Sequence, residues 1–363
     1  MAIIDKPTDY FNTVLWSGDN VDGRAITTGL ETNWTWAKRR NATNGFIIAD
    51  SVRGATYKLD SSTTNAEVNN YDGGHLESFT STGFTMGVGS GDFGHLNASG
   101  GTYVAWNWKA GTSFTNDASA TGIGTLDSSG SVNATAGFSI ISFTGTETSS
   151  QSVAHGLGAV PELIISKSLA VADNWMVHHG SFSAQDYISL NTTAAKASAS
   201  SVWTSLPTST VINIGDNAGV NDNGAMIMYA FRSVQGYSKF GSYTGNGSTD
   251  GTFVYTGFKP AWFMIKRTDA NSYWTIFDNK RSSSGGSNEI DYSLDANVSN
   301  AEETGTSVND VDFLSNGIKI REDNGDLNSS GSTIIYMAFA ENPFVTSTGV
   351  PATARWLCSY LLT

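Results

Sequence analysis

The chain is poor in cysteine, in charged residues and in long apolar runs, and each shortage excludes something. A single cysteine, Cys358, cannot form a disulfide within the chain, so we expect packing rather than cross-links to stabilise the fold. Charged residues make up 15%, against a typical share of about 25%. The net charge of −13 and the lack of a basic stripe argue against a nucleic-acid partner. No apolar run approaches the roughly 18 residues of a membrane span, so no membrane insertion is expected.

Glycine and aromatic residues are abundant instead. Glycine supplies 39 of the 363 residues, above the usual share of roughly 7%. Ser, Thr, Asn and Gly separate short aromatic and β-branched runs, a pattern typical of an all-β fold with hardly any helix. The chain has 10 Trp, 13 Tyr and 18 Phe. They suffice for three modest cores, because each buried aromatic removes on the order of 150–250 Å² from water.

The chain contains three copies of one spaced pattern. In each copy a lysine ends a strand-like run, an aromatic follows eight residues later, and two further positions follow at intervals of four and three residues. The three sets are Lys38, Phe46, Asp50 and Arg53; Lys167, Trp175, His179 and Phe182; and Lys266, Trp274, Asp278 and Arg281. The spacing has no gap in any copy, which indicates one repeated structural unit.

Each copy also opens and closes alike. The openings are Trp16-Ser-Gly18, Phe143-Thr-Gly145 and Tyr243-Thr-Gly245, and an Asn-x-x-Gly (Asn97–Gly100, Asn221–Gly224, Asn328–Gly331) precedes each closing aromatic strand. From Gly18 to Ala105 is 87 residues, from Gly145 to Ala230 is 85, and from Gly245 to Ala338 is 93. Asn and Gly both tolerate positive φ, so we expect a hairpin turn at Asn-x-x-Gly.

A period of about a hundred residues makes each copy the size of a domain. We therefore predict an all-β chain of three tandem homologous β-sandwich, jelly-roll-like modules with short extensions at both ends. The expected parts are an N-terminal arm (1–10), module 1 (11–109), a Gly/Ser/Thr-rich linker (110–136), module 2 (137–234), module 3 (235–342) and a C-terminal extension (343–363). Strands such as 262–266 carry apolar residues on both faces, which predicts burial on both sides.

The sequence contains none of the common metal or nucleophile motifs, so we expect no catalytic residue, no metal site and no cofactor. His178 and His179 stand where the other copies have an apolar residue and Asp, so we interpret them as strand-end residues rather than metal ligands. The acidic loops 216–222 and 321–326 could offer oxygens to Ca²⁺. Their spacing does not match an EF-hand, and calcium binding stays open.

An acidic set occurs in modules 1 and 3 alone. Leu59-Asp60 is followed by Asn65-Ala66-Glu67, and Leu294-Asp295 by Asn300-Ala301-Glu302, whereas module 2 has Leu190 and Asn191. An acid pair of this kind could serve glycoside hydrolysis. Alternatively, Arg53 and Arg281 make bidentate bonds to nearby carboxylates and pin a loop. We favour the second interpretation, because module 2 lost the set and kept the framework.

The positions that we assign to this repeated framework are Lys38, Asp50, Arg53, Asp60, Lys167, Trp175, Lys266, Trp274, Asp278, Arg281 and Asp295.

The best candidate for ligand binding is the loop that contains Tyr71, Asp72 and His75. An aromatic flanked by carboxylate, imidazole and amide groups suits stacking on a sugar ring, although a solvated loop tip is the alternative. The segments 197–206, around Trp203, and 282–289 are the positions that would serve modules 2 and 3.

The C-terminal extension is too apolar to be left in water. We assign Trp356, Leu357, Tyr360 and Leu361 to a contact with a neighbouring subunit, or else with the body of the same chain. Together with the apolar start Met1–Ile4, this predicts a multimer.

Several phrases give the chain a likeness to a known family. The first is the segment Lys38–Glu67, which contains Asp50-Ser-Val-Arg53-Gly54. The second is Tyr103-Val-Ala-Trp-Asn-Trp-Lys-Ala-Gly111. The third is Glu341–Arg355, which ends in Val350-Pro-Ala-Thr-Ala-Arg355. Nearly the whole chain resembles a family of virion proteins of marine tailed bacteriophages, usually labelled tail-fibre or structural proteins. The resemblance implies a place in a virus particle, assembled in the host cytoplasm, and no catalytic residues. The chain lacks the coiled-coil heptads or collagen-like shaft of a long fibre.

The expected function is therefore that of a virion structural protein, a tail-fibre or appendage component. Its repeated β-sandwich surfaces would attach to the host surface many times over, and a triplicated module suits that better than a single catalytic centre. Its partners would be other virion proteins, copies of itself and a host glycan or protein. A capsid head-decoration or cement protein is the alternative, and a polysaccharide depolymerase is a less favoured one.

Overall fold

The structure is a computed structural model, and it describes residues 3–69, 76–88, 96–283, 288–305 and 309–351. The expected all-β fold is confirmed. Within the described residues the helices are short: the 3₁₀ turn η1 (Pro7–Asp9), α1 (Ala118–Thr121) and α2 (Ala218–Asn221). Everything else that is regular consists of antiparallel strands, as the β-branched and aromatic runs between Gly, Asn and Ser predicted.

Each module contains a large sheet, and the three large sheets have one strand order. In module 1 the order is β1 (Phe11–Ser17), β9 (Thr102–Trp108), β3 (Trp34–Arg39), β4 (Ile47–Asp50), β5 (Gly54–Leu59) and β6 (Val68–Asn69). Module 2 repeats it with β12 (Phe138–Thr144), β19 (Ala225–Phe231), β14 (Leu163–Ser168), β15 (Met176–His179), β16 (Asp186–Ser189) and β17 (Ala197–Ser198). Module 3 repeats it with β20 (Ser238–Thr244), β29 (Thr333–Pro343), β22 (Phe258–Arg267), β23 (Thr275–Asp278), β25 (Tyr292–Asp295) and β26 (Glu303–Thr304).

A smaller sheet covers one face of each large sheet. These sheets are β2 (Arg24–Thr27), β8 (Gly83–Met86) and β7 (Leu76–Thr80); β13 (Gln151–Ala154) and β18 (Val211–Ile214); and β21 (Phe253–Tyr255), β28 (Gly317–Ile320), β27 (Val311–Leu314) and β24 (Glu289–Ile290). Each pair of sheets encloses its own apolar cluster. On β22, Phe263 and Ile265 enter that cluster, while Trp262 and Met264 enter a different one on the opposite face. The predicted burial on both sides is therefore confirmed.

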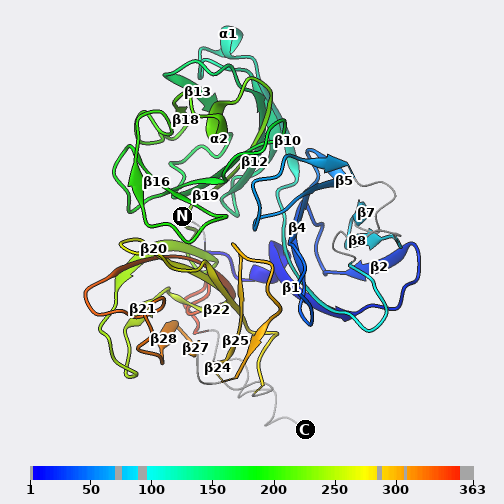
Figure 1. The fold of residues 1–363 in the computed structure, drawn as a ribbon, viewed down its shortest axis with the longest axis vertical. Coiled ribbons are helices and arrows are strands. Elements are labelled where there is room, and N and C mark those ends of the chain that lie inside the picture. Colours follow the sequence, from blue (N-terminus) through cyan, green and yellow to red (C-terminus); the bar gives the residue numbers. More distant parts are fainter. Residues whose placement is uncertain (1–2, 70–75, 89–95, 284–287, 306–308, 352–363) are drawn as a thin grey trace.

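The second face of every large sheet points to the centre of the molecule, where the three modules meet in a ring (Figure 1). Trp108, Phe231 and Phe339 hold the same register position, opposite Trp34, Leu163 and Trp262. Their rings contact one another at centroid distances of 5.4, 6.0 and 6.5 Å. Because the three equivalent side chains meet, the modules are arranged around a pseudo-threefold axis that passes through a shared aromatic core.

The segment 110–136, which we expected to be a linker, is ordered structure. It forms β10 (Thr112–Asn116) and β11 (Ser128–Asn133), which extend the large sheet of module 2 beyond β12. Small residues permit this: a Cβ at Gly130 would lie 1.9 Å from the carbonyl oxygen of Ile140. The prediction was wrong because a Gly/Ser/Thr-rich strand gains its stability from pairing with the edge of β12, which local composition does not reveal.

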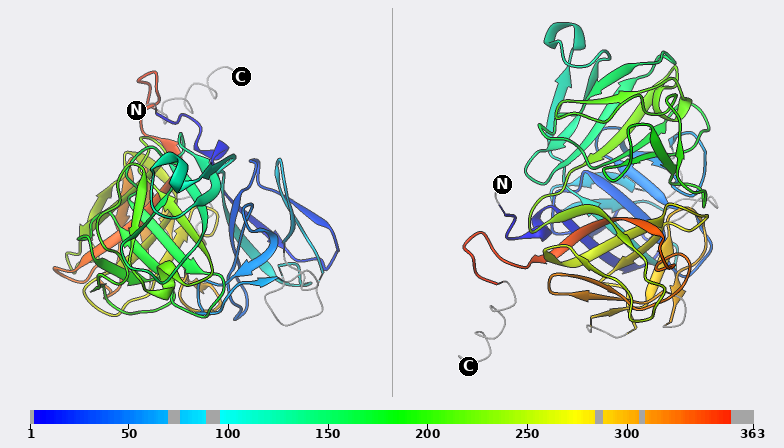
Figure 2. Two further views of the ribbon diagram at one scale, coloured as in Figure 1. Left: turned by 90° about the horizontal axis from the view of Figure 1, so that it is seen from above. Right: turned by 90° about the vertical axis from the view of Figure 1, so that its left-hand side faces the viewer.

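The described ends of the chain lie side by side at one end of the ring (Figure 2). Ile4 is buried in the shared core, and its N–H donates to the carbonyl of Gln235. The N–H of Ser347 donates to Asp5 Oδ1 at 2.6 Å. The expectation that Met1–Ile4 forms an exposed apolar end is therefore wrong for Ile4, which packs on its own chain.

Candidate functional site

The three repeated lysines join the modules. Each Nζ lies at the end of a buried strand and donates to a backbone carbonyl of the next module around the ring: Lys38 to Ser299 (3.2 Å), Lys167 to Thr64 (3.2 Å) and Lys266 to Thr193 (2.8 Å). Each also donates to carbonyls of its own module. Module 1 thus contacts module 3, module 3 contacts module 2, and module 2 contacts module 1, which closes the ring.

Burial decides the electrostatics of these lysines. Removal from water lowers the pKa of Lys38, of Lys167 and of Lys266 to about 8 in each case. Nearby carboxylates, such as those of Asp60, Asp173 and Asp326, oppose this effect because they stabilise the ammonium form. The lysines therefore cross-link the seams between modules through hydrogen bonds.

Backbone and indole hydrogen bonds repeat at the same seams. Backbone N–H groups of Glu67, Lys196 and Glu302 donate to carbonyls of Leu169, Thr268 and Arg40 in the neighbouring module. The indoles of Trp175 and Trp274 donate to the carbonyls of Asp60 and Ser189. At the third seam Phe46 cannot donate, and the hydroxyl of Ser61 donates to the carbonyl of Ala296 instead. The repeated aromatic position is thus part of the joint between modules.

The Asp-x-x-Arg pairs of modules 1 and 3 are buried ion networks. Arg53 Nε contacts Asp50 Oδ2 at 2.5 Å, and its Nη1 contacts Glu67 at 2.8 Å. Burial disfavours the charged form of Arg53, but Asp50, Tyr229 and Glu67 outweigh it and raise the pKa. Tyr229 of module 2 donates its hydroxyl to Asp50 at 2.8 Å. The network therefore ties module 1 to module 2.

Module 3 has the same network with a different donor. Arg281 contacts Asp278 at 2.5 Å and Glu302 at 2.8 Å. The indole of Trp106, which holds the register position of Tyr229, donates to Asp278 at 2.9 Å from module 1. Glu302 also accepts from Arg40 of module 1. The arginines bind two carboxylates each, rather than one carboxylate with both nitrogens as we expected.

Asp60 and Asp295 take no part in these networks. Asp60 accepts from the N–H groups of Phe46 and Ser62, so it fixes a turn. Asp295 accepts from the hydroxyl of Thr275 at 2.8 Å. Burial raises the pKa of Asp295 to about 7.

Module 2 replaces the whole network at once. His179, Phe182 and Lys196 hold the positions of Asp, Arg and Glu, and Lys196 Nζ lies 5.5 Å from the centre of the Phe182 ring. His179 Nδ1 accepts from the N–H of Ser181, so Nε2 carries the proton and faces the carbonyl of Tyr336 in module 3 at 3.3 Å. Burial lowers the pKa of His179 to about 4. The register position of Tyr229 and Trp106 is held by Met337 at this seam. Met337 belongs to module 3 and has no proton to donate.

The Asn-x-x-Gly motif is not the hairpin turn that we expected, because the described strands before and after it, such as β18 and β19, belong to different sheets. Its asparagines are buried, and each side chain bonds the loop that follows the aromatic-(Ser/Thr)-Gly opening. The acceptors are Val21, Thr148 and Ser248, whose carbonyls bind the Nδ2 of Asn97, Asn221 and Asn328. The opening glycine must be small: a Cβ at Gly18, Gly145 or Gly245 would lie 2.0–2.2 Å from a carbonyl oxygen.

Two of the sequence equivalences need correction. The ladders align Ala230 and Ala338 with Asn107 rather than Ala105. They also align Ile188, rather than Leu190, with Leu59. Alternating strands repeat every two residues, so a shift of two keeps the same face and is difficult to detect from sequence.

The candidate ligand residues have two outcomes. Trp203 is 2% exposed and lies in the core between the sheets of module 2, so the prediction that it binds a ligand is wrong. Tyr71, Asp72 and His75 lie outside the described residues, as do Trp356, Leu357, Tyr360 and Leu361. The sequence gives no sign that a tryptophan in this polar segment is buried, but Trp203 pairs with Ile214 in a β-bridge.

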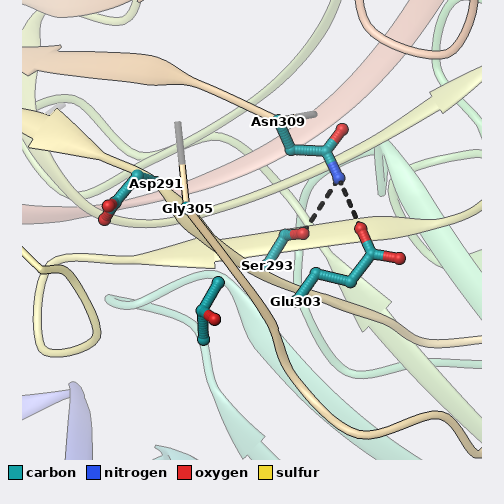
Figure 3. A pocket seen from close by; sticks show the side chains of 6 residues that line it. Asp291, Ser293, Glu303, Gly305 and Asn309 are labelled. Carbon is teal, nitrogen blue, oxygen red and sulfur yellow. Dashed lines mark hydrogen bonds between the residues drawn. The ribbon is translucent and has the colours of Figure 1, made fainter. Parts of the chain in front are cut away.

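A polar pocket of about 270 Å³ lies at the last hairpin of the large sheet in module 3, among Asp291, Ser293, Glu303, Gly305 and Asn309 (Figure 3). Asn309 Nδ2 donates to Ser293 Oγ at 3.0 Å and to Glu303 at 3.2 Å. Asp291 is bound by both the N–H and the hydroxyl of Ser283. The polar groups that line the pocket are thus already hydrogen-bonded within the protein. The bonds of Asn309 stabilise the hairpin.

In the described part of the chain, no group of three or more His, Cys, Asp or Glu side chains is placed to hold a metal ion. None of the helices described there is long and apolar enough to cross a membrane.

The fold and its seams define a class of protein: one chain that builds a closed ring of three β-sandwiches around a pseudo-threefold axis. The chain belongs to the family DUF7483, a domain of unknown function, whose model matches residues 6–343. The family model thus covers all three modules of this chain rather than a single one. No curated protein and no solved structure matches the chain.

Proposed function

We propose that this protein is a structural component of a bacteriophage virion, in a tail fibre or another appendage, that attaches the particle to the host surface through several β-sandwich surfaces. The observation that carries the proposal is the closed ring itself. One aromatic core fixes three sandwiches in one orientation, and their smaller sheets face outward. Rigid presentation of several similar surfaces suits multivalent binding, where fixed geometry strengthens weak contacts by roughly 10²–10⁴-fold.

The buried acids favour this role over a depolymerase. An acid pair for glycoside hydrolysis needs carboxyl groups that can reach a sugar. The candidate acids Glu67 and Glu302 are largely buried, at 17% and 6% side-chain exposure, and each is bound by an arginine. Asp60 accepts from two backbone N–H groups and Asp295 from the hydroxyl of Thr275. They serve the ring as structural groups.

The placement of the chain ends supports an appendage with a defined polarity. The N-terminal arm and residues 344–351 leave the ring at one end (Figure 2), where Asp5 binds Ser347. Attachment to other virion proteins, or to further copies of the chain, at this end leaves the opposite end of the ring free. The contact with the host is then made by the loops at that free end.

Immuno-electron microscopy of virus particles tests this proposal. Gold-labelled antibody raised against the purified chain is expected on the tail or its appendages. Labelling spread over the capsid would support the alternative role in head decoration and overturn the assignment to the tail. Absence of the chain from purified particles would overturn a virion role altogether.

A second experiment tests host attachment. Tyr71→Ala combined with His75→Ala is expected to slow adsorption to host cells without changing the yield of intact particles, because stacking on the host glycan is lost. The matched control is Tyr273→Ala, which removes an aromatic that is 41% exposed in another module. Adsorption of the double variant at the wild-type rate would move recognition away from this loop.

A further inference from the structure

An open pocket of about 390 Å³ lies beside the chain ends, within the roughly 300–1,000 Å³ range of ligand-binding clefts. It is lined by Ser233–Gly236, Ser238 and Lys239 on one side and by Tyr255–Gly257, Phe344 and Val345 on the other. Tyr255 is 54% exposed, a high value for a large aromatic, and Lys239 Nζ lies 5.3 Å from the centre of its ring. Phe253, two residues earlier on the same face of β21, is 43% exposed. The pocket therefore continues into a strip of uncovered aromatic surface.

The chain itself returns to this pocket. After Phe344 and Val345, which form part of the wall, it reverses in a tight turn in which Gly349 has a φ of 79° and Thr346 N–H donates to the carbonyl of Val350. Pro351 then pairs with Val345 in a β-bridge. Because Asp5 binds Ser347 in the same turn, the direction of this hairpin is fixed. Pro351, the last described residue, thus lies beside the wall of the pocket.

The sequence that follows is suited to an apolar pocket. In the twelve residues 352–363, Trp356, Cys358, Tyr360 and Leu362 alternate with their neighbours at the spacing of a strand, so they share one face if the segment is extended. Trp356 is five residues beyond Pro351. An extended chain of that length reaches about 17 Å. The indole is therefore within reach of the pocket from a fixed starting point.

We propose that the pocket between β20, β21 and Val345 is the docking site of the same chain's C-terminal segment 352–363, with the indole of Trp356 seated beside Tyr255. The short tether gives the segment an effective concentration in the millimolar range at its own pocket. A copy from another chain has no such advantage. Docking covers Tyr255 and Phe253 and completes the apolar surface at the end of the ring where the chain ends meet.

The single cysteine of the chain allows a direct test. Gln235→Cys places a second thiol on the exposed rim of the pocket, and a disulfide with Cys358 requires the two Cα atoms to come within roughly 4.4–6.8 Å. Under mild oxidation of the full-length protein, we expect a disulfide within one chain, identified by peptide mapping without reduction. The matched control is Leu206→Cys, another exposed position, which lies in module 2 and does not line the pocket. The yield from Gln235→Cys should be at least fivefold that of the control.

Two further outcomes decide the details. Adding Trp356→Ala to Gln235→Cys should reduce the yield severalfold, because the indole holds the segment in place; an unchanged yield would overturn the role given to Trp356. Equal yields from Gln235→Cys and Leu206→Cys would overturn the docking site. A disulfide that links two chains and yields dimers would overturn docking within the chain and identify a second copy as the source of the segment.

Discussion

His179 makes the ring sensitive to acid at one seam. The neutral imidazole accepts from Ser181 and faces the carbonyl of Tyr336 with its protonated nitrogen. Its pKa, lowered by burial to about 4, lies below the ordinary value of 6.5. The unfolded chain therefore binds a proton between pH 6.5 and 4 that the folded chain does not bind. The free energy of unfolding consequently falls as the pH is lowered through this range, by about 2 kcal/mol at pH 5.

The variant His179→Gln tests this effect, because an amide can make both hydrogen bonds without titrating. Unfolding in urea at pH 7 and at pH 5 should show a smaller loss for the variant, by about 2 kcal/mol. His178 is present in both proteins, so its own titration cancels. Equal losses in the two proteins would show that His179 is not held neutral.

Asp295 has the opposite dependence on pH. Burial raises the pKa of this half-buried carboxyl to about 7 from the ordinary value of 3.8. Its contribution to stability is complete below pH 4 and is lost as the pH rises through 7. Asp295→Asn keeps an oxygen for Thr275 and removes the charge. We expect the variant to be more stable than wild type by roughly 1–3 kcal/mol at pH 8 and equal to it at pH 4, measured by urea unfolding. A destabilised variant at pH 8 would contradict this account.

At the level of residues, the sequence predicted positions better than partners. The ungapped spacing identified the lysines, the aromatics and the Asp/His positions as a framework. It did not reveal that Tyr229 and Trp106 donate to Asp50 and Asp278, since these residues are more than 170 positions apart. An alignment of the three closing strands in their correct register would have shown the signal. One position of these strands is Tyr or Trp in the two copies that meet an aspartate of the next module, and Met in the copy that meets a histidine.

Among the elements, the junction between each opening loop and its closing strand depends on a glycine. At Gly245 an added Cβ would lie 2.2 Å from the carbonyl oxygen of Ser329, and backbone cannot give way cheaply. Gly245→Ala should lower the free energy of unfolding by about 2 kcal/mol or more. Gly325→Ala is a matched control in the same module, because its Cβ would lie 3.8 Å from an arginine nitrogen. Thermal unfolding should separate the two variants clearly, and equal melting temperatures would refute the close contact.

The strands that the sequence predicted best are those with apolar residues on both faces, such as β22. Such strands lie between two cores, so apolar residues occupy both of their faces and are visible in the sequence. The strands β10 and β11 were missed because their residues are small and polar, and backbone pairing with the edge of β12 stabilises them. Local propensity carries no information about an available edge.

For the whole molecule, the sequence established three units but not how they are arranged. The hydrogen bonds that close the ring have backbone carbonyls as acceptors. Every residue type has a carbonyl, so the sequence does not show which residues accept these bonds. The lysines that bind these carbonyls are visible in the repeat, yet a repeated lysine at a strand end is equally compatible with modules in a row. Only the cyclic pattern of contacts, with module 1 bound to module 3, distinguishes the two arrangements.

The seam lysines should contribute strongly to stability. Lys167→Met removes three hydrogen bonds and leaves carbonyls, among them that of Thr64, without this donor. We expect a loss of about 2–4 kcal/mol in the free energy of unfolding, since an unsatisfied buried acceptor costs about 1–3 kcal/mol. Lys109→Met breaks an exposed pair with Glu31 and should change stability by less than about 0.5 kcal/mol. Equal effects of the two substitutions on urea unfolding would contradict the role of the seam.

The central claim is that three sandwiches share one core and form one cooperative body. Scanning calorimetry of the full-length chain tests it most directly. Near 60 °C unfolding absorbs about 0.7 kcal/mol per residue, so a ring that unfolds as a unit has a van't Hoff enthalpy of roughly 250 kcal/mol. We predict a single transition in which this enthalpy equals the calorimetric one. Separate transitions, or a van't Hoff enthalpy near the roughly 70 kcal/mol of one module, would show that the modules unfold independently and would contradict the account.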